Sequence, residues 1–138
     1  MNRNKLLDKF ENLTKALKRL QEILEIKADN KMIQRDASIQ RFEFTIETFW
    51  KFLKRLLEFS GETEVLFPKQ IMKKAYSYHL LNDENMWLDM LKDRNMTSHI
   101  YDEDQINEIF KRIKKYYPEM QKTYDLLKEK FKNELTIK

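Results

Sequence analysis

Arg94, Asn95, His99 and Tyr101 are the residues of this sequence whose types and spacing best suit chemistry. Arginine carries a permanent, forked cation that binds phosphate oxygens, and histidine takes up or releases a proton near neutral pH. Together they suit reactions in which a phosphate is held while a proton moves to or from a hydroxyl or leaving oxygen. The bare spacing Arg-x4-His is nevertheless a weak signal, because many proteins carry it by chance.

Arg94 stands on a helical stripe that begins with large apolar residues. Trp87, Leu91, Arg94 and Ser98 are spaced 4, 3 and 4 residues apart, which places them on one face of a helix. A charge on such a stripe costs on the order of several kcal/mol unless a partner meets it. We therefore expect Arg94 to have a carboxylate partner, a functional role, or both.

Arg94 and His99 cannot share one face of a continuous helix. Five residues at about 100° each separate them by roughly 140°. The sequence predicts that the helix ends between them, because Thr97-Ser98 and a helix cap at Asp102 lie close by. A second subunit related by a two-fold axis could also complete the site.

Other kinds of site find little support in the sequence. It contains no glycine-rich phosphate loop, no His-x-x-x-His or Glu-x-x-His spacing and no Ser-His-Asp signature, so we expect neither a metal site nor a cofactor. The absence of cysteine excludes disulfides and thiolate ligands and fits a reducing cytoplasm. His79, the other histidine, lies near a predicted helix end and has no cluster of partners around it in sequence.

The composition is typical of a helical protein. Of 138 residues, 36% are charged and 41% hydrophobic, with one glycine and two prolines. No window approaches the roughly 18 apolar residues of a membrane span, and the N-terminus lacks an apolar signal core. The net charge of +4 permits a phosphate-bearing partner without requiring one. We expect one soluble domain over residues 1–138.

Apolar periodicity predicts five helices, at about 4–26, 34 or 36–59, 68–80, 83–99 and 102–134. Asn30 is expected to cap the end of the first helix, Gly61 to stop the second, and Pro118 to kink or break the fifth. The predicted fold class is all-α, an antiparallel up-down bundle of four long helices and one shorter helix. The aromatic surface of the second and fourth helices predicts a homodimer, unless those side chains only fill a thick core.

Three segments also carry a likeness to a known family: Ile39-Gln40-Arg41-Phe42-Glu43-Phe44, Trp50-Lys51 with Leu53-Lys54, and Asp93-Arg94-Asn95 followed by Ser98-His99-Ile100-Tyr101-Asp102-Glu103. With these segments the sequence resembles the HEPN-domain proteins of the minimal nucleotidyltransferase-associated type, also described as nucleotidyltransferase substrate-binding proteins. The resemblance extends over nearly the whole chain. It implies an all-α HEPN-like bundle that dimerises.

The same resemblance implies a metal-independent endoribonuclease that acts as the toxin of a toxin–antitoxin pair. In that scheme the ribose 2′-OH attacks the adjacent phosphate, His99 is the general acid/base, Arg94 holds the phosphate and Asn95 orients one of them. Tyr101 fits the extended motif Arg-x4-His-x-Tyr, and a cognate minimal nucleotidyltransferase antitoxin would silence the toxin by adenylylating it. The attached nucleotide would block RNA by its charge and bulk.

Two alternatives stay open on the sequence. Within the same family, the chain would be a non-catalytic nucleotide- or substrate-binding subunit of a two-component nucleotidyltransferase, with the motif as a phosphate cradle. In a purely structural bundle, Arg94 would pair with Asp93, Asp102 or another acid, and His99 and Tyr101 would be ordinary helix-end and interface residues. What Arg94 contacts in the folded chain therefore bears on the choice.

Overall fold

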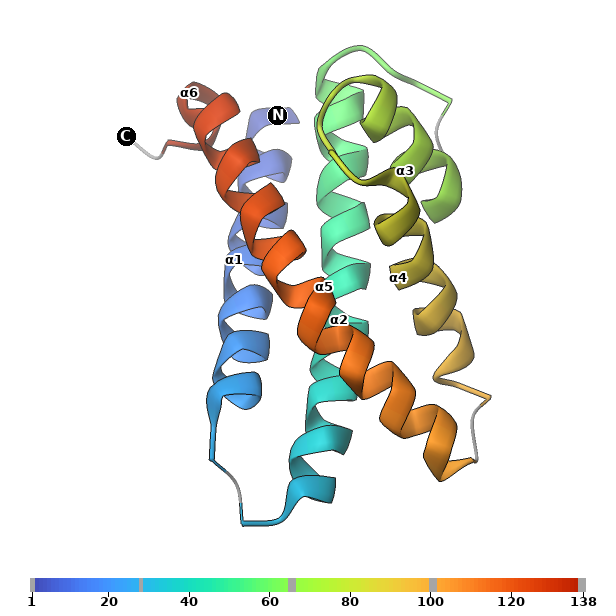
Figure 1. Ribbon diagram of the computed structural model, residues 1–138. Coiled ribbons are helices and arrows are strands. Elements are labelled where there is room, and N and C mark those ends of the chain that lie inside the picture. The colour runs from blue at the N-terminus through green and yellow to red at the C-terminus, as the bar shows by residue number, and fades with distance from the viewer. Residues whose placement is uncertain (1, 28, 65–66, 100–101, 137–138) are drawn as a thin grey trace.

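Six helices form the described part of the chain, in a computed structural model that describes residues 2–27, 29–64, 67–99 and 102–136, residues 2 and 3 by their backbone only. They are α1 (Asn2–Glu25), α2 (Lys31–Phe59), α3 (Pro68–Ser77), α4 (Glu84–Met96), α5 (Glu103–Lys130) and α6 (Lys132–Leu135). The predicted all-α antiparallel bundle is confirmed: in Figure 1, α1 descends, α2 rises, α4 descends and α5 rises across them. The lengths are distributed differently from the prediction, because α1, α2 and α5 are long while α3, α4 and α6 are shorter.

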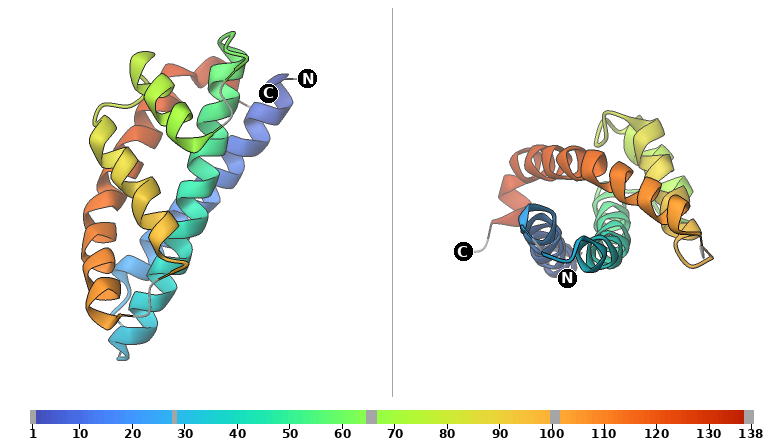
Figure 2. Two further views of the ribbon diagram at one scale, coloured as in Figure 1. Left: turned by 90° about the vertical axis from the view of Figure 1, so that its right-hand side faces the viewer. Right: turned by 60° about the horizontal axis from the view of Figure 1, so that its bottom comes forward.

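The centre of the bundle is α2, whose apolar face is broad enough to contact several neighbours. α1 packs along it, and α5 crosses both helices on one side, as the end-on view in Figure 2 shows. Phe49 of α2 meets Trp87 of α4 edge to face, with ring centroids 4.5 Å apart, and Phe42 stacks on Tyr116 of α5 at 5.6 Å. All four side chains are buried, so part of the aromatic surface predicted for an interface fills the core of one chain.

Asn30 begins α2 instead of ending α1. Its side-chain oxygen accepts hydrogen bonds from the backbone N–H groups of Met32 and Ile33, at 3.0 and 3.1 Å. These donors have no partner inside a first helical turn, and an asparagine just before the turn satisfies them. The predicted C-cap at Asn30 is therefore wrong, and α2 begins at Lys31, earlier than expected.

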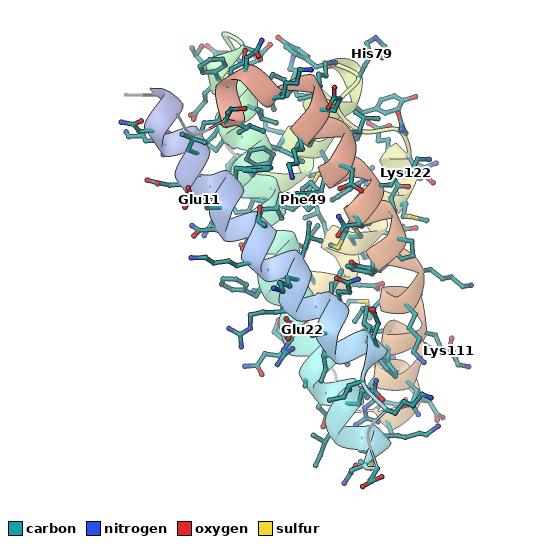
Figure 3. The ribbon with its side chains drawn as sticks, turned by 90° about the vertical axis from the view of Figure 1, so that its left-hand side faces the viewer. Glu11, Glu22, Phe49, His79, Lys111 and Lys122 are labelled. Carbon is teal, nitrogen blue, oxygen red and sulfur yellow. The ribbon has the colours of Figure 1, made fainter. Side chains whose placement is uncertain are left out.

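α2 and α3 end in the same backbone motif. Gly61 has a φ of 104° and His79 a φ of 62°, both in the left-handed region. In each case the next amide bonds to the carbonyl five residues back, at 2.9 Å. Gly61 thus ends α2 as predicted. His79 sits in a turn at the outer end of the bundle, as Figure 3 shows, and its ring has no hydrogen bond with a described residue.

Pro118 lies inside α5, which continues unbroken from Glu103 to Lys130. The predicted alternative of a break is therefore wrong. A proline removes one hydrogen bond and crowds the preceding turn. Here the buried side chains of Tyr116, Met120 and Thr123 hold the helix on the core on both sides of the proline, and this packing outweighs the lost bond.

Candidate functional site

α4 carries the arginine of the motif and ends before the histidine. The last helical residue is Met96, and Thr97 caps the helix, so the predicted ending between Arg94 and His99 is confirmed. The backbone N–H of His99 bonds to the carbonyl of Met96 at 2.9 Å, which closes a tight turn. His99 therefore lies beyond the regular helix, in which its side chain would have pointed away from Arg94.

Arg94 lies against two glutamates of α2. Its Nη1 is 3.5 Å from Glu43 Oε2, and its Nε is 3.4 Å from Glu47 Oε1. Neither contact has hydrogen-bond geometry, and Nε is buried without a hydrogen-bond partner among the described residues. Partly exposed pairs of this kind contribute about 0–1 kcal/mol each, so the glutamates orient the guanidinium more than they stabilise the fold. The expected partner thus comes from α2, and neither Asp93 nor Asp102 supplies it.

Glu43 also connects Arg94 to the turn that follows α4. Its Oε2 lies 2.8 Å from Thr97 Oγ1, and the carbonyl of Arg94 lies 2.7 Å from the same hydroxyl, whose single proton the two acceptors share. One carboxylate therefore fixes both the cation and the first residue after the helix. Glu43 and Glu47 are four residues apart, which places them on one face of α2. That spacing is the signal in the sequence from which the pair could have been found.

A groove of about 540 Å³ opens beside Arg94, between α2, α4 and the start of α3. Aromatic and aliphatic side chains form part of its wall, and three cations line it, Arg94, Lys69 and Lys92. Trp50, which also lines the groove, donates its indole N–H to Glu47 Oε2 at 3.0 Å. A concave surface with apolar walls and several cations suits a ligand that combines a phosphate with a flat apolar group.

The structure assembles only part of the predicted site within one chain. Arg94 and Asn95 both line the groove. His99 is exposed and does not line it, and its side chain makes no hydrogen bond or ion pair with a described residue. Tyr101 lies outside the described residues. The arginine half of the motif is therefore in place, and a complete site needs His99 to approach it from the same chain or from a second one.

A buried network anchors the helical turn that carries Arg94. The carboxylate of Asp93 accepts two hydrogen bonds from Arg112 of α5, at 2.7 and 2.9 Å, and one from the Tyr116 hydroxyl at 2.6 Å. Burial, together with the hydrogen bond to Asp93, raises the pKa of Tyr116, so this hydroxyl stays a donor. Because Asp93 is only 4% exposed, the network fixes α4 against α5 next to the site.

A second network fixes the start of α5, the helix that follows the motif. Arg35, 5% exposed, donates from Nη1 to Glu103 at 2.6 Å and to Asn107 at 3.0 Å. The hydrogen bond to Glu103 is the main reason why the pKa of the Arg35 guanidinium is raised. Glu103 is the first residue of α5. Arg35 therefore fixes the C-terminal end of the segment that contains His99. Local sequence patterns do not reveal this role, because the partners of Arg35 lie 68 and 72 residues away.

Two further properties can be stated for the described residues. No group of three or more histidine, aspartate or glutamate side chains among them is placed to hold a metal ion. None of the helices that these residues form is long and apolar enough to cross a membrane. The groove offers a guanidinium, an amide and two ammonium groups, which are donors suited to phosphate oxygens, together with the carboxylates of Glu47 and Asp89.

The chain is similar to known proteins in its sequence and in its fold. Residues 8–129 match the family described as nucleotidyltransferase substrate binding protein like. A probable ribonuclease HepT from Haemophilus influenzae is 31% identical over 80 residues, and the match spans 55% of each protein, about half the length of this curated relative. A crystal structure of a protein from Thermus thermophilus is similar with a TM-score of 0.75 and 35% identity, over 83% of this chain and 98% of that one.

Proposed function

Because the chain belongs to the nucleotidyltransferase substrate binding protein like family, the HepT-like HEPN proteins, we propose that it is a metal-independent endoribonuclease and the toxin of a toxin–antitoxin pair. The proposal rests chiefly on Arg94, whose cation lies at a groove and keeps a buried Nε without a hydrogen-bond partner among the described residues. The name of the curated relative, a probable ribonuclease, favours RNA as the ligand.

In the proposed reaction, Arg94 holds the scissile phosphate and His99 moves the protons. The ribose 2′-OH loses its proton to an imidazole and attacks the adjacent phosphorus. As the new O2′–P bond forms, the P–O5′ bond breaks and the leaving oxygen takes a proton from an imidazolium. The products are a 2′,3′-cyclic phosphate and a 5′-hydroxyl. Arg94 balances the charge that builds up on the phosphate, and Asn95 orients the phosphate or the histidine.

The proposed cleft lies between two copies of the chain. A two-fold axis near the end of α4 would bring two pairs of Arg94 and His99 together, so that one histidine serves as base and the other as acid. Exposed apolar side chains near this region, Phe67 at 65% and Met96 at 37%, offer surface for the contact. Light scattering should give twice the chain mass of 17.0 kDa. The mass of a single chain across a wide concentration range would contradict this cleft.

The first test is expression in bacteria without any partner protein. Wild type is expected to arrest growth and degrade RNA, because the active site is then unmodified. His99→Ala is expected to allow normal growth at the same level of folded protein. Equal growth and intact RNA with both proteins would count against the toxin.

Silencing through Tyr101 is a separate expectation. A cognate nucleotidyltransferase antitoxin would attach an adenylate to the Tyr101 hydroxyl, two residues from His99 in sequence, and the added charge and bulk would exclude RNA. Co-expression with the antitoxin should add one or more adenylate masses to the intact chain, and Tyr101→Phe should abolish the addition. An unmodified chain, or the same added mass on Tyr101→Phe, would remove Tyr101 from the scheme.

The groove supports one alternative, a non-catalytic nucleotide-binding subunit. Its volume of about 540 Å³, with Trp50 beside three cations, is of a size that accommodates a nucleotide. This alternative predicts measurable nucleotide affinity that Arg94→Ala weakens, and no RNA cleavage by the wild type. Calorimetric titration with a nucleoside triphosphate, beside an RNA cleavage assay, separates the two functions.

A further inference from the structure

A second surface suited to nucleic acid lies where α1 meets α2, outside the Arg94 groove. Phe44 of α2 is 61% exposed although its neighbours along the helix are buried or half-buried. It borders two hollows of about 330 and 380 Å³, which also share Ala16 and Arg19 in their walls. The methyl side chains of Ala16 and Ala37 leave this space between the helices. An exposed ring with open space beside it offers a face on which a base can stack.

The side chains around Phe44 are mainly cationic. Four basic residues line the two hollows: Lys15, Lys18, Arg19 and Arg41. None of them takes part in the ion pairs among the described residues, whereas the arginines of the site and of both buried networks are held by carboxylates. Glu22 is the one carboxylate among the described residues that line either hollow. The surface is therefore positive, and its cations lack carboxylate partners among the described residues, although Arg41 Nη1 donates a hydrogen bond to the carbonyl of Arg19 at 2.7 Å.

This surface continues from the Arg94 groove around α2. Phe44 directly follows Glu43, which contacts Arg94, and each residue of a helix is turned by about 100° from the last. Lys51 lies between the two surfaces on the helix, with its ammonium 5.7 Å from the ring centre of Trp50 in the groove. An extended strand that leaves the groove past Trp50 and Lys51 would reach Phe44 within a few nucleotides.

We propose that Phe44 and the four surrounding cations form a secondary binding surface for single-stranded RNA. A base stacks on the Phe44 ring, and the lysines and arginines contact the phosphates on either side. This inference rests on the proposed ribonuclease function and adds that the substrate extends from the scissile linkage across α2 to α1. Single-stranded RNA fits best because the bases of a duplex are not free to stack on a side chain. A second copy of the same surface would be repelled by its like charge.

The test compares long and short RNA on protein that cannot cleave it. In the His99→Ala background, affinity is measured for single-stranded oligonucleotides of 12 and of 3 nucleotides. Phe44→Ala is expected to weaken binding of the longer RNA about tenfold or more and to leave the shorter unchanged, while Phe44→Trp retains affinity. Changing Lys15 and Lys18 to glutamine should lower the salt dependence of binding by about one to two units in the log–log slope.

A matched control comes from α5. Lys111 and Lys122 are exposed and point away from α1 in Figure 3, so changing both to glutamine removes the same charge from another face. Lys111 differs from the tested lysines in lying 3.4 Å from Glu108. This control is expected to have much the smaller effect. Equal losses from both lysine pairs, or equal affinity of wild-type and Phe44→Ala protein for the longer RNA, would overturn the secondary surface.

Failure of this inference can be told apart from failure of the proposed function. Cleavage of short RNA by protein with an intact His99, together with unchanged affinity of Phe44→Ala, would overturn only the secondary surface. An absence of RNA binding by every protein would overturn both. A lower oligomeric mass of Phe44→Ala in light scattering would assign Phe44 to a contact between copies of the chain and overturn RNA as its ligand.

Discussion

Replacing His99 with alanine is expected to slow RNA cleavage on the order of 10²–10⁴-fold, because positioned proton transfer contributes about that much to catalysis. The rate is measured on purified protein with a labelled RNA oligonucleotide in the presence of a metal chelator. His99 is exposed, so its replacement should leave thermal unfolding unchanged. A His99→Ala protein that cleaves RNA at the wild-type rate would end the assignment of this residue.

Arg94 is expected to act on the phosphate in the same assay. Arg94→Ala should lower kcat and raise KM together, because the guanidinium contacts the phosphate before and during the reaction. Glu43→Gln keeps an acceptor for Thr97 but removes one of the charges beside Arg94. We expect it to slow cleavage less than Arg94→Ala, with an unchanged melting temperature. A fall in melting temperature that accounts for the lost activity would make Glu43 a structural residue only.

Replacing Asp93 with alanine is expected to lower the free energy of unfolding by about 3 kcal/mol. The change leaves the buried Tyr116 hydroxyl without its acceptor and Arg112 without the carboxylate that now accepts two of its hydrogen bonds. It also frees the turn of α4 that carries Arg94. Unfolding in urea, followed by circular dichroism, measures the change.

Asp89 provides a control for this experiment on the same helix. It is exposed and makes no hydrogen bond with a described residue, so Asp89→Ala should change the free energy of unfolding by less than about 0.5 kcal/mol. Tyr116→Phe removes one of the three hydrogen bonds to Asp93 and should fall between the two. Equal stability of the Asp93 and Asp89 variants would show that the network does not anchor α4.

Local sequence determined much of the fold. Apolar residues at helical spacing gave the approximate extent of each main helix. Asp102 caps α5 as predicted, and Asp83, at the start of the fourth predicted range, caps α4; each accepts a hydrogen bond from a backbone amide of the first turn. These features depend on residues a few positions apart, so the physics that sets them is visible in the sequence. For the same reason, the end of α4 between Arg94 and His99 could be predicted.

The C-cap predicted at Asn30 and the break that was one of two alternatives predicted at Pro118 were wrong. Asparagine is common at both ends of helices, and here the free backbone amides at the start of α2 donate hydrogen bonds to the Asn30 side chain. Pro118 disfavours a helix locally, but Tyr116 and Met120 are buried on either side of it and keep α5 continuous. At Asn30 the choice lay between two local caps, and the bonds to the amides two and three residues on decided it. At Pro118 a local preference of about 3 kcal/mol against the helix was outweighed by packing against the core.

The candidate site also has one part that the local sequence predicts and another that depends on tertiary contacts. The sequence by itself predicts Arg94, Asn95, His99 and Tyr101 as site residues and a partner for the arginine. Only the tertiary structure decided that the partners are Glu43 and Glu47, and that Arg94 and Asn95 share a groove. It also decided which distant residues fix the segment around the motif, through the networks of Asp93 and Arg35. Residues this far apart in sequence meet only where the packing of large buried side chains sets how the helices cross, and periodicity within one helix does not contain that information.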